Sequence, residues 1–164
     1  LAQGRLAHGW VLWLDAGASE ALLLAARAHH LRRWVVPRSS YPEGRPGYLT
    51  WRRDQKVRHA AELRAILAAE GIEPATVARA CTIVTKAGLG SDPEVQIFEG
   101  AVCLTFLQTQ LTSTIDKVHD DDHMVAVIAK TLTKMSDAGK AAALTIEFDS
   151  HGAELVGRAL ELPG

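Results

Sequence analysis

Long apolar runs, leader-like segments and familiar catalytic motifs are all missing from this chain of 164 residues. No apolar run approaches the roughly 18 to 20 residues that a membrane-spanning helix needs, so we expect no contact with membranes. No basic and apolar leader opens the sequence, so we expect no retained signal peptide. The chain begins at Leu1 rather than at Met, and we therefore expect an N-terminal truncation. The phosphate-binding Walker loop, the Gly-x-Ser-x-Gly elbow and the dinucleotide fingerprint are absent, which disfavours the enzyme classes built on them.

Cysteine is almost as scarce, because the chain contains only Cys81 and Cys103. The two residues lack the Cys-x-x-Cys spacing of zinc ribbons and redox motifs. Both fall within segments of helical pattern. We therefore expect two buried free thiols in a protein of the reducing cytoplasm.

The alternating apolar and polar pattern of β-strands is also nearly absent, whereas Ala, Leu, Glu and Arg dominate the long segments. The composition is 48% apolar and 23% charged, with a net charge of -1, which is typical of a globular protein. The sequence thus predicts an all-α fold, with one compact multi-helix domain over residues 1–164. Apolar periodicity and helix-start residues place the helices at 5–14, 19–34, 48–70, 74–86, 93–115, 120–134, 137–144 and 150–160. Prolines and glycines within 36–47 predict a break.

Basic residues gather in one part of the chain. Between Arg27 and Arg64 there are ten basic and three acidic residues, a net charge of +7, so the remainder carries -8. This asymmetry indicates either an anionic ligand or mutual pairing of the two parts. Six of the nine aromatic residues also lie in the first third of the chain. They either pack one corner of the core or form part of a functional wall.

A carboxylate on an apolar helix face is the most informative single feature. Glu99 lies within the apolar stripe of the 93–115 helix, so its side chain should face the core. A carboxylate buried there must be paired, protonated or bound to a metal.

Histidines on or beside the apolar faces of three other helices supply further candidate ligands. Imidazoles and a carboxylate from separate helices are what a divalent transition metal requires. We predict a metal of unspecified identity bound by His30, His59 and Glu99, with His8 as a weaker fourth ligand and His29 as the alternative to His30. The competing interpretation is that each histidine is a hydrogen-bonded core residue.

The segment from Trp34 to Arg53 is stiffened by prolines and rich in arginine. Guanidinium groups offer forked donors to phosphate or carboxylate, so we predict that Arg38, Arg45 and Arg52 clamp a small anionic or phosphorylated ligand. In the alternative, this is a solvated loop whose arginines pair with nearby carboxylates. Nucleic acid is not favoured, because no long basic stripe or recognition-helix pattern accompanies the loop.

The run from His119 to His123 encloses three aspartates and superficially suggests a metal cluster. Three carboxylates in the first turn of a helix are ordinarily capping residues that match the helix dipole. We expect capping here.

The motifs of this chain resemble those of DUF4202, a family of domains of unknown function. The residues that carry the resemblance are His30-Leu31-Arg32-Arg33-Trp34, Pro37-Arg38, Tyr41-Pro42, Arg45, Gly47-Tyr48, Trp51-Arg52, His59-Ala60, Asp92-Pro93-Glu94-Val95-Gln96, Glu99, Cys103-Leu104, Phe106-Leu107, Lys130-Thr131 and Lys134-Met135-Ser136. The resemblance covers most of the chain, and residues 30–59 are its most specific part. It implies a layout similar to a divergent relative of the helical HD-type metal phosphohydrolases.

The sequence departs from the HD pattern at two positions. The expected His-Asp doublet is replaced by His30-Leu31, and Gly100 stands where a second acidic residue is expected beside Glu99. Either change would leave a weaker mononuclear site or a scaffold without metal.

These residues and the resemblance suggest two alternative functions. The first is a metal-dependent phosphohydrolase acting on a small phosphorylated or nucleotide-like substrate, in which the metal activates a water and the arginines hold the phosphate oxygens. The second is a non-catalytic helical module that binds an anionic ligand or a protein partner through the arginine-rich loop. In this second case we expect Glu99 to pair with a loop arginine or a histidine.

Overall fold

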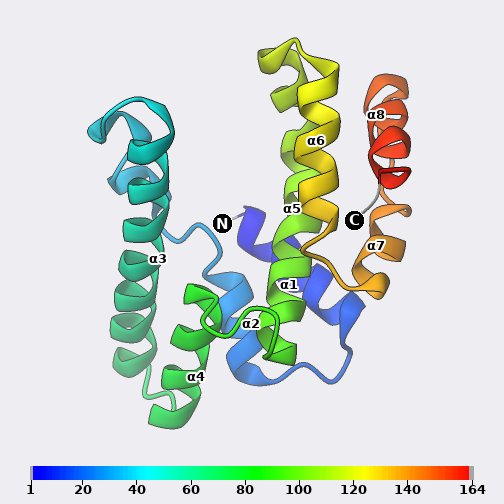
Figure 1. Cartoon of the computed structure of the whole chain (residues 1–164). Coiled ribbons are helices and arrows are strands. Elements are labelled where there is room, and N and C mark those ends of the chain that lie inside the picture. The colour runs from blue at the N-terminus through cyan, green and yellow to red at the C-terminus, as the bar shows by residue number, and fades with distance from the viewer. Residues whose placement is uncertain (1, 163–164) are drawn as a thin grey trace.

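All regular elements of the computed structural model, which describes residues 2–162, are helical (Figure 1). This confirms the predicted all-α fold. The α-helices are α1 (Ala2–Leu14), α2 (Glu20–Arg27), α3 (Gly44–Ala69), α4 (Pro74–Thr85), α5 (Pro93–Val118), α6 (Asp121–Leu132), α7 (Asp137–Ala143) and α8 (Ser150–Leu160). Two short 3₁₀ helices, η1 (Arg33–Val35) and η2 (Arg38–Ser40), lie between α2 and α3. Within the described residues, no helix has both the length and the apolar character needed to cross a membrane.

The predicted starts of α2 and α5 are confirmed, because their capping side chains bind free backbone N–H groups. Ser19 Oγ accepts from the N–H of Leu22 at 3.2 Å, and Asp92 Oδ1 accepts from that of Glu94 at 3.1 Å. Pro93 then occupies the first turn of α5, where its missing N–H costs no hydrogen bond.

The predicted 19–34 helix is wrong in its second half, because α2 ends at Arg27. His30 and Arg32 then have φ angles of 60° and 46°, in the left-handed region that stops a helix. Side chains of α3 bind carbonyl groups of this turn: Arg58 donates to Arg32 O at 3.0 Å, and Trp51 donates to Val36 O at 3.0 Å. These tertiary hydrogen bonds hold residues 28–36 in a tight turn.

The predicted break over 36–47 is too long, because α3 already begins at Gly44. Pro46 fits the first turn of that helix, where the backbone N–H groups have no partners within the helix. Gly47 is required by close packing, since a Cβ there would lie 2.0 Å from the carbonyl oxygen of Pro42.

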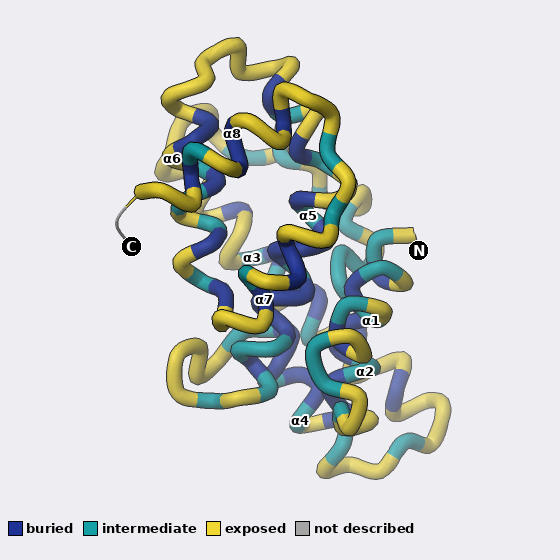
Figure 2. The backbone as a smooth tube through the Cα atoms, turned by 90° about the vertical axis from the view of Figure 1, so that its right-hand side faces the viewer, coloured by how far each residue is buried: buried dark blue, intermediate teal, exposed yellow. Residues whose placement is uncertain are grey.

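The long helix α5 runs through the middle of the molecule and joins two apolar clusters (Figure 1). The first cluster packs α1, α2 and α4 against the N-terminal half of α5, and the C-terminal half of α3 joins it through Leu63 and Leu67, mainly against α4. The second packs α6, α7 and α8 against the C-terminal half. Trp10 and Leu14 of α1 contact both clusters, so the helices form one compact domain. Figure 2 shows buried residues concentrated along α5 and exposed residues on the outer turns.

Candidate functional site: a cationic pocket

A small pocket opens where the turn after α2 meets α3, the end of α4 and the first half of α5. Its volume is about 100 Å³. It is lined by His29, His30, Arg33, Trp51, Arg52, Gln55, Lys56, His59, Val84, Lys86, Phe98 and Val102. Segments far apart in the sequence therefore supply its histidines and cations.

The turn that carries His29, His30 and Arg33 is held in place by α3. Gln55 Nε2 donates to Val36 O at 3.0 Å, alongside the bond from Trp51. The Arg33 guanidinium stacks over the Trp51 ring at 4.5 Å from its centroid. These contacts fix the position of the turn relative to the α3 side of the pocket.

Two of the lining residues, His30 and Lys86, adopt left-handed backbone conformations with φ of 60°. For residues other than glycine this conformation costs about 1–2 kcal/mol. Lys86 occupies the C-cap of α4, where glycine is the usual residue. Strain of this kind is typical of sites where the side chain itself is needed.

Lys86 reaches from that C-cap to Glu99 on α5. Its Nζ atom bonds Glu99 Oε2, and Lys134 Nζ lies 4.0 Å from Glu99 Oε1. Glu99 is buried, as its position on the helix predicts. Its partners are lysines, so the expected pairing with a loop arginine or a histidine is wrong. Cys103 Sγ lies 3.9 Å from the same carboxylate, and burial together with that charge raises the pKa of the thiol to about 12.

His29 and His30 stack at 3.9 Å between ring centroids. The His30 ring is fully engaged, because Nδ1 bonds Gln3 and Nε2 bonds Arg33. Burial lowers the pKa of His29 to about 2 and that of His30 to about 3, helped by the charges of neighbouring cations. Both rings are therefore neutral at neutral pH.

His59 faces the same pocket from α3 and is only 7% exposed. Its Nε2 atom is buried and has no hydrogen-bond partner. Burial, reinforced by the charges of Arg58 and Arg33, lowers the pKa of His59 to about 4. Two other atoms of α3, Arg58 Nε and Glu62 Oε2, are likewise buried without a partner.

Four cationic side chains, those of Arg33, Arg52, Lys56 and Lys86, line this pocket with no acidic residue among them. Burial and the charges of Lys86 and Arg52 lower the pKa of Lys56, a sign of crowded positive charge. Such an arrangement attracts anions.

Comparison with known proteins identifies the family. The profile of the domain of unknown function DUF4202 matches residues 2–156. The chain belongs to the DUF4202 family. No curated protein and no solved structure matches it.

This DUF4202 domain brings together three of the residues predicted from sequence, His30, His59 and Arg52. Glu99 adjoins the pocket through its ion pair with Lys86. His8 lies on α1 and does not line the pocket.

The two remaining predicted anion ligands, Arg38 and Arg45, also lie outside the pocket of the DUF4202 domain. Arg38 folds back onto its own loop and donates to Tyr41 O at 2.9 Å and to Pro42 O at 2.7 Å. Arg45 is exposed. Sequence reasoning missed Arg33, Lys56 and Lys86 as pocket residues, although the first two lie within the basic segment that it singled out.

The donors of the predicted metal set do not fit a metal in this arrangement. Across residues 2–162, no three His, Cys, Asp or Glu side chains are placed to hold a metal ion together. Glu99 is bound by Lys86, and both nitrogens of His30 have partners. Only His59 Nε2 of this set is buried without a partner.

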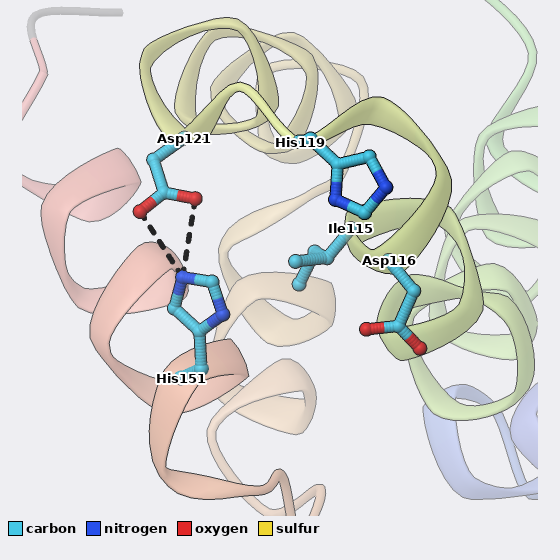
Figure 3. A pocket seen from close by; sticks show the side chains of 5 residues that line it. All are labelled: Ile115, Asp116, His119, Asp121 and His151. Atoms are coloured by element: carbon cyan, nitrogen blue, oxygen red, sulfur yellow. Dashed lines mark hydrogen bonds and ion pairs between the residues drawn. The ribbon is translucent and has the colours of Figure 1, made fainter.

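A second, more open hollow of about 570 Å³ lies between α5, α6 and α8 (Figure 3). His151 Nε2 lies 3.1 Å from both carboxylate oxygens of Asp121, while Asp116 and His119 lie on the opposite side. Asp120 caps α6 by accepting from the N–H of His123 at 2.9 Å. This confirms the capping predicted for the aspartate run.

Proposed function

We propose that this DUF4202 domain binds the phosphoryl group of a small anionic ligand in the cationic pocket. The observation that carries the proposal is the convergence of four cationic side chains on a cavity that no carboxylate lines. Anions gain most where several cations face a partly desolvated space. The protein then acts as a binding module, which is the second of the two functions considered from the sequence.

The size of the pocket favours a single phosphoryl group. Its volume of about 100 Å³ is small beside the roughly 300–1,000 Å³ of pockets that enclose a whole drug-sized ligand. A phosphate group fits this space, and the rest of a larger ligand would lie outside, towards exposed residues such as Tyr48 and Arg52. The Arg52 guanidinium already lies 5.7 Å from the Tyr48 ring centroid, at the rim.

The cations divide into two kinds. Arg33 and Arg52 present planar guanidinium groups that match two oxygens of a phosphate at once. Lys56 and Lys86 provide compact charges that bind without fixed geometry. Because Lys86 is shared with Glu99, we expect Arg52 and Lys56 to contribute most to affinity.

The metal-dependent phosphohydrolase and the HD-like ancestry behind it stay predictions. The meeting of His30 and His59 in one pocket supports them, but the ion pair of Glu99 does not. Elemental analysis of protein purified without added metal, before and after His59→Ala, tests this function. A metal content below a tenth of an equivalent in both proteins, with no phosphatase activity after addition of Mn²⁺, Fe²⁺ or Zn²⁺, would rule out this function.

Isothermal titration calorimetry with phosphate and simple phosphomonoesters, in the presence of EDTA, tests the binding proposal. We expect the Arg52→Gln/Lys56→Gln variant to bind at least tenfold more weakly than the wild type, with affinity falling as salt rises. Arg38→Gln/Arg45→Gln removes the same charge from the same basic segment outside the pocket and is the matched control. Equal losses in the two variants, or no binding by the wild type, would refute the proposal.

A further inference from the structure

The two carboxylate oxygens of Glu99, beside the pocket, are bound unequally. Oε2 bonds Lys86 Nζ. Oε1 has only distant partners, because Cys103 Sγ lies 3.9 Å away and Lys134 Nζ lies 4.0 Å away. A strong hydrogen bond between an ammonium group and a carboxylate joins atoms at roughly 2.7–2.9 Å. Oε1 can therefore accept one closer hydrogen bond from a cation.

Lys134 is placed to donate that bond. Its backbone is fixed, because the next residue, Met135, is buried in the second apolar cluster and Lys134 O accepts from Gln96 Nε2 at 2.5 Å. Its side chain is 38% exposed, whereas that of Lys86 is 13% exposed. A lysine stem is flexible, so the ammonium group can approach Oε1 while the backbone stays in place.

An anion in the pocket gives this movement a purpose. It would bring a second negative charge close to Glu99, and both would share the charge of Lys86, which lines the pocket and bonds Glu99. Because Glu99 and Lys86 are largely shielded from water, repulsion between the two anions is poorly screened and weakens binding. A second cation at Glu99 removes that penalty. Burial and nearby cations, Lys134 among them, lower the pKa of Lys56, so Lys134 lies within electrostatic reach of the pocket.

Building on the proposed function, we propose that Lys134 is a positioning residue of the anion site, which closes onto Glu99 Oε1 when the anion binds and so makes the charge of Lys86 available to the ligand. Lys134 does not line the pocket, and its effect passes through Glu99. The anion site then depends on both apolar clusters, since Lys134 is anchored beside the second and the pocket lies beside the first.

Calorimetric titration with inorganic phosphate in the presence of EDTA compares Lys134→Met with a matched control. Lys130, one turn earlier on α6, is exposed, so Lys130→Met removes the same charge without touching Glu99. We expect Lys134→Met to bind phosphate about fivefold or more weakly than the wild type, at the lower end of coupling between sites, and Lys130→Met to bind as the wild type does. Equal affinities in the two variants would overturn the inference while leaving the proposed pocket intact. Failure of the wild type to bind phosphate would overturn both.

A double-mutant cycle with Glu99→Gln separates action through Glu99 from direct contact with the ligand. Removal of the carboxylate removes the repulsion, so Glu99→Gln should bind phosphate more tightly than the wild type, which structural damage would not produce. In that background Lys134→Met should weaken binding by less than about twofold, because the two residues act through one interaction. A loss as large as in the wild-type background would show that Lys134 binds the anion itself and would overturn the positioning role.

A crystal structure with phosphate bound gives a readout that needs no variant. Lys134 Nζ should then lie within hydrogen-bond distance of Glu99 Oε1, at roughly 2.7–3.2 Å. A Lys134 Nζ atom that stays 4.0 Å away, or that bonds the phosphate instead, would contradict the inference.

Discussion

The Nζ atom of Lys86 and the carboxylate of Glu99 form a buried ion pair that joins the end of α4 to the first half of α5. Their side chains are 13% and 5% exposed, so neither charge is well hydrated. The pair stands beside the pocket and holds one of its four cations in place. Its loss should change both stability and anion binding.

Removal of one partner of this pair should be strongly destabilising. Lys86→Met removes the close cation from Glu99 and leaves Lys134 Nζ 4.0 Å away, so we expect a loss of about 3–5 kcal/mol in the free energy of unfolding. The double variant Lys86→Met/Glu99→Leu removes both charges and should recover most of that loss. Urea denaturation of the three proteins measures the effect. A double variant no more stable than Lys86→Met would contradict the account.

Arg58 should affect anion binding without touching the ligand. It lies outside the pocket lining, donates to Arg32 O and Gln55, and pairs with Glu62 at 2.6 Å. Arg58→Met frees the turn that carries His30 and Arg33, so we expect weaker phosphate binding together with greater amide hydrogen exchange over residues 28–36. Arg64→Met, farther along α3, is the control. Unchanged affinity in Arg58→Met would show that the turn is held without this residue.

Two glycine substitutions should have opposite effects on stability. Gly47→Ala places a methyl group against the backbone of Pro42, which cannot give way as a flexible side chain would. We expect a loss of about 1–3 kcal/mol, since overpacking costs this much. Gly9→Ala lies within α1 with no atom within 4 Å of the new Cβ, and it should stabilise the protein by about 0.5–1 kcal/mol. Thermal unfolding compares the two, and a stabilising Gly47→Ala would contradict the packing described for the start of α3.

The contact between His151 and Asp121 should make stability depend on pH. The hydrogen bond that His151 donates to Asp121, helped by the charge of that carboxylate, raises the pKa of His151 above 6.5. Because the pKa is raised in the folded state, the stabilisation is fully present below the pKa of the unfolded chain and disappears as the pH rises through the folded pKa.

The advantage of the wild type over His151→Ala in urea midpoint should therefore shrink between about pH 6 and about pH 8. Asp121→Asn should abolish the same dependence. A constant difference between wild type and His151→Ala across this range would show that the pair carries no charge-dependent stability.

Helical periodicity predicted the fold and much of the site, because it depends on local patterns. It correctly placed Glu99 on a buried face, and it placed His59 near the apolar stripe of its helix. It could not identify Lys86 as the partner of Glu99, since that contact depends on a left-handed C-cap at the end of another helix. The extension of the second helix past Arg27 failed for a similar reason, because hydrogen bonds from α3 hold the turn.

The predicted anion clamp also depended on tertiary contacts that local sequence patterns do not specify. Of the three arginines predicted to form the clamp, only Arg52 lines the pocket, while Arg38 is used by its own loop and Arg33 and Lys56 reach the pocket from either side of the predicted segment. The predicted metal ligands were chosen by burial and residue type alone. The relative positions of these side chains depend on how α1, α3 and α5 pack, which the sequence pattern does not specify.

The most direct test is a crystal structure of the protein soaked with tungstate or phosphate, with the heavy oxyanion located by anomalous scattering. We expect a single main peak in the pocket, within hydrogen-bond distance of the Arg52 guanidinium and Lys56 Nζ. A main peak at Arg38 or Arg45, or an empty pocket under conditions in which the protein binds phosphate in solution, would contradict it.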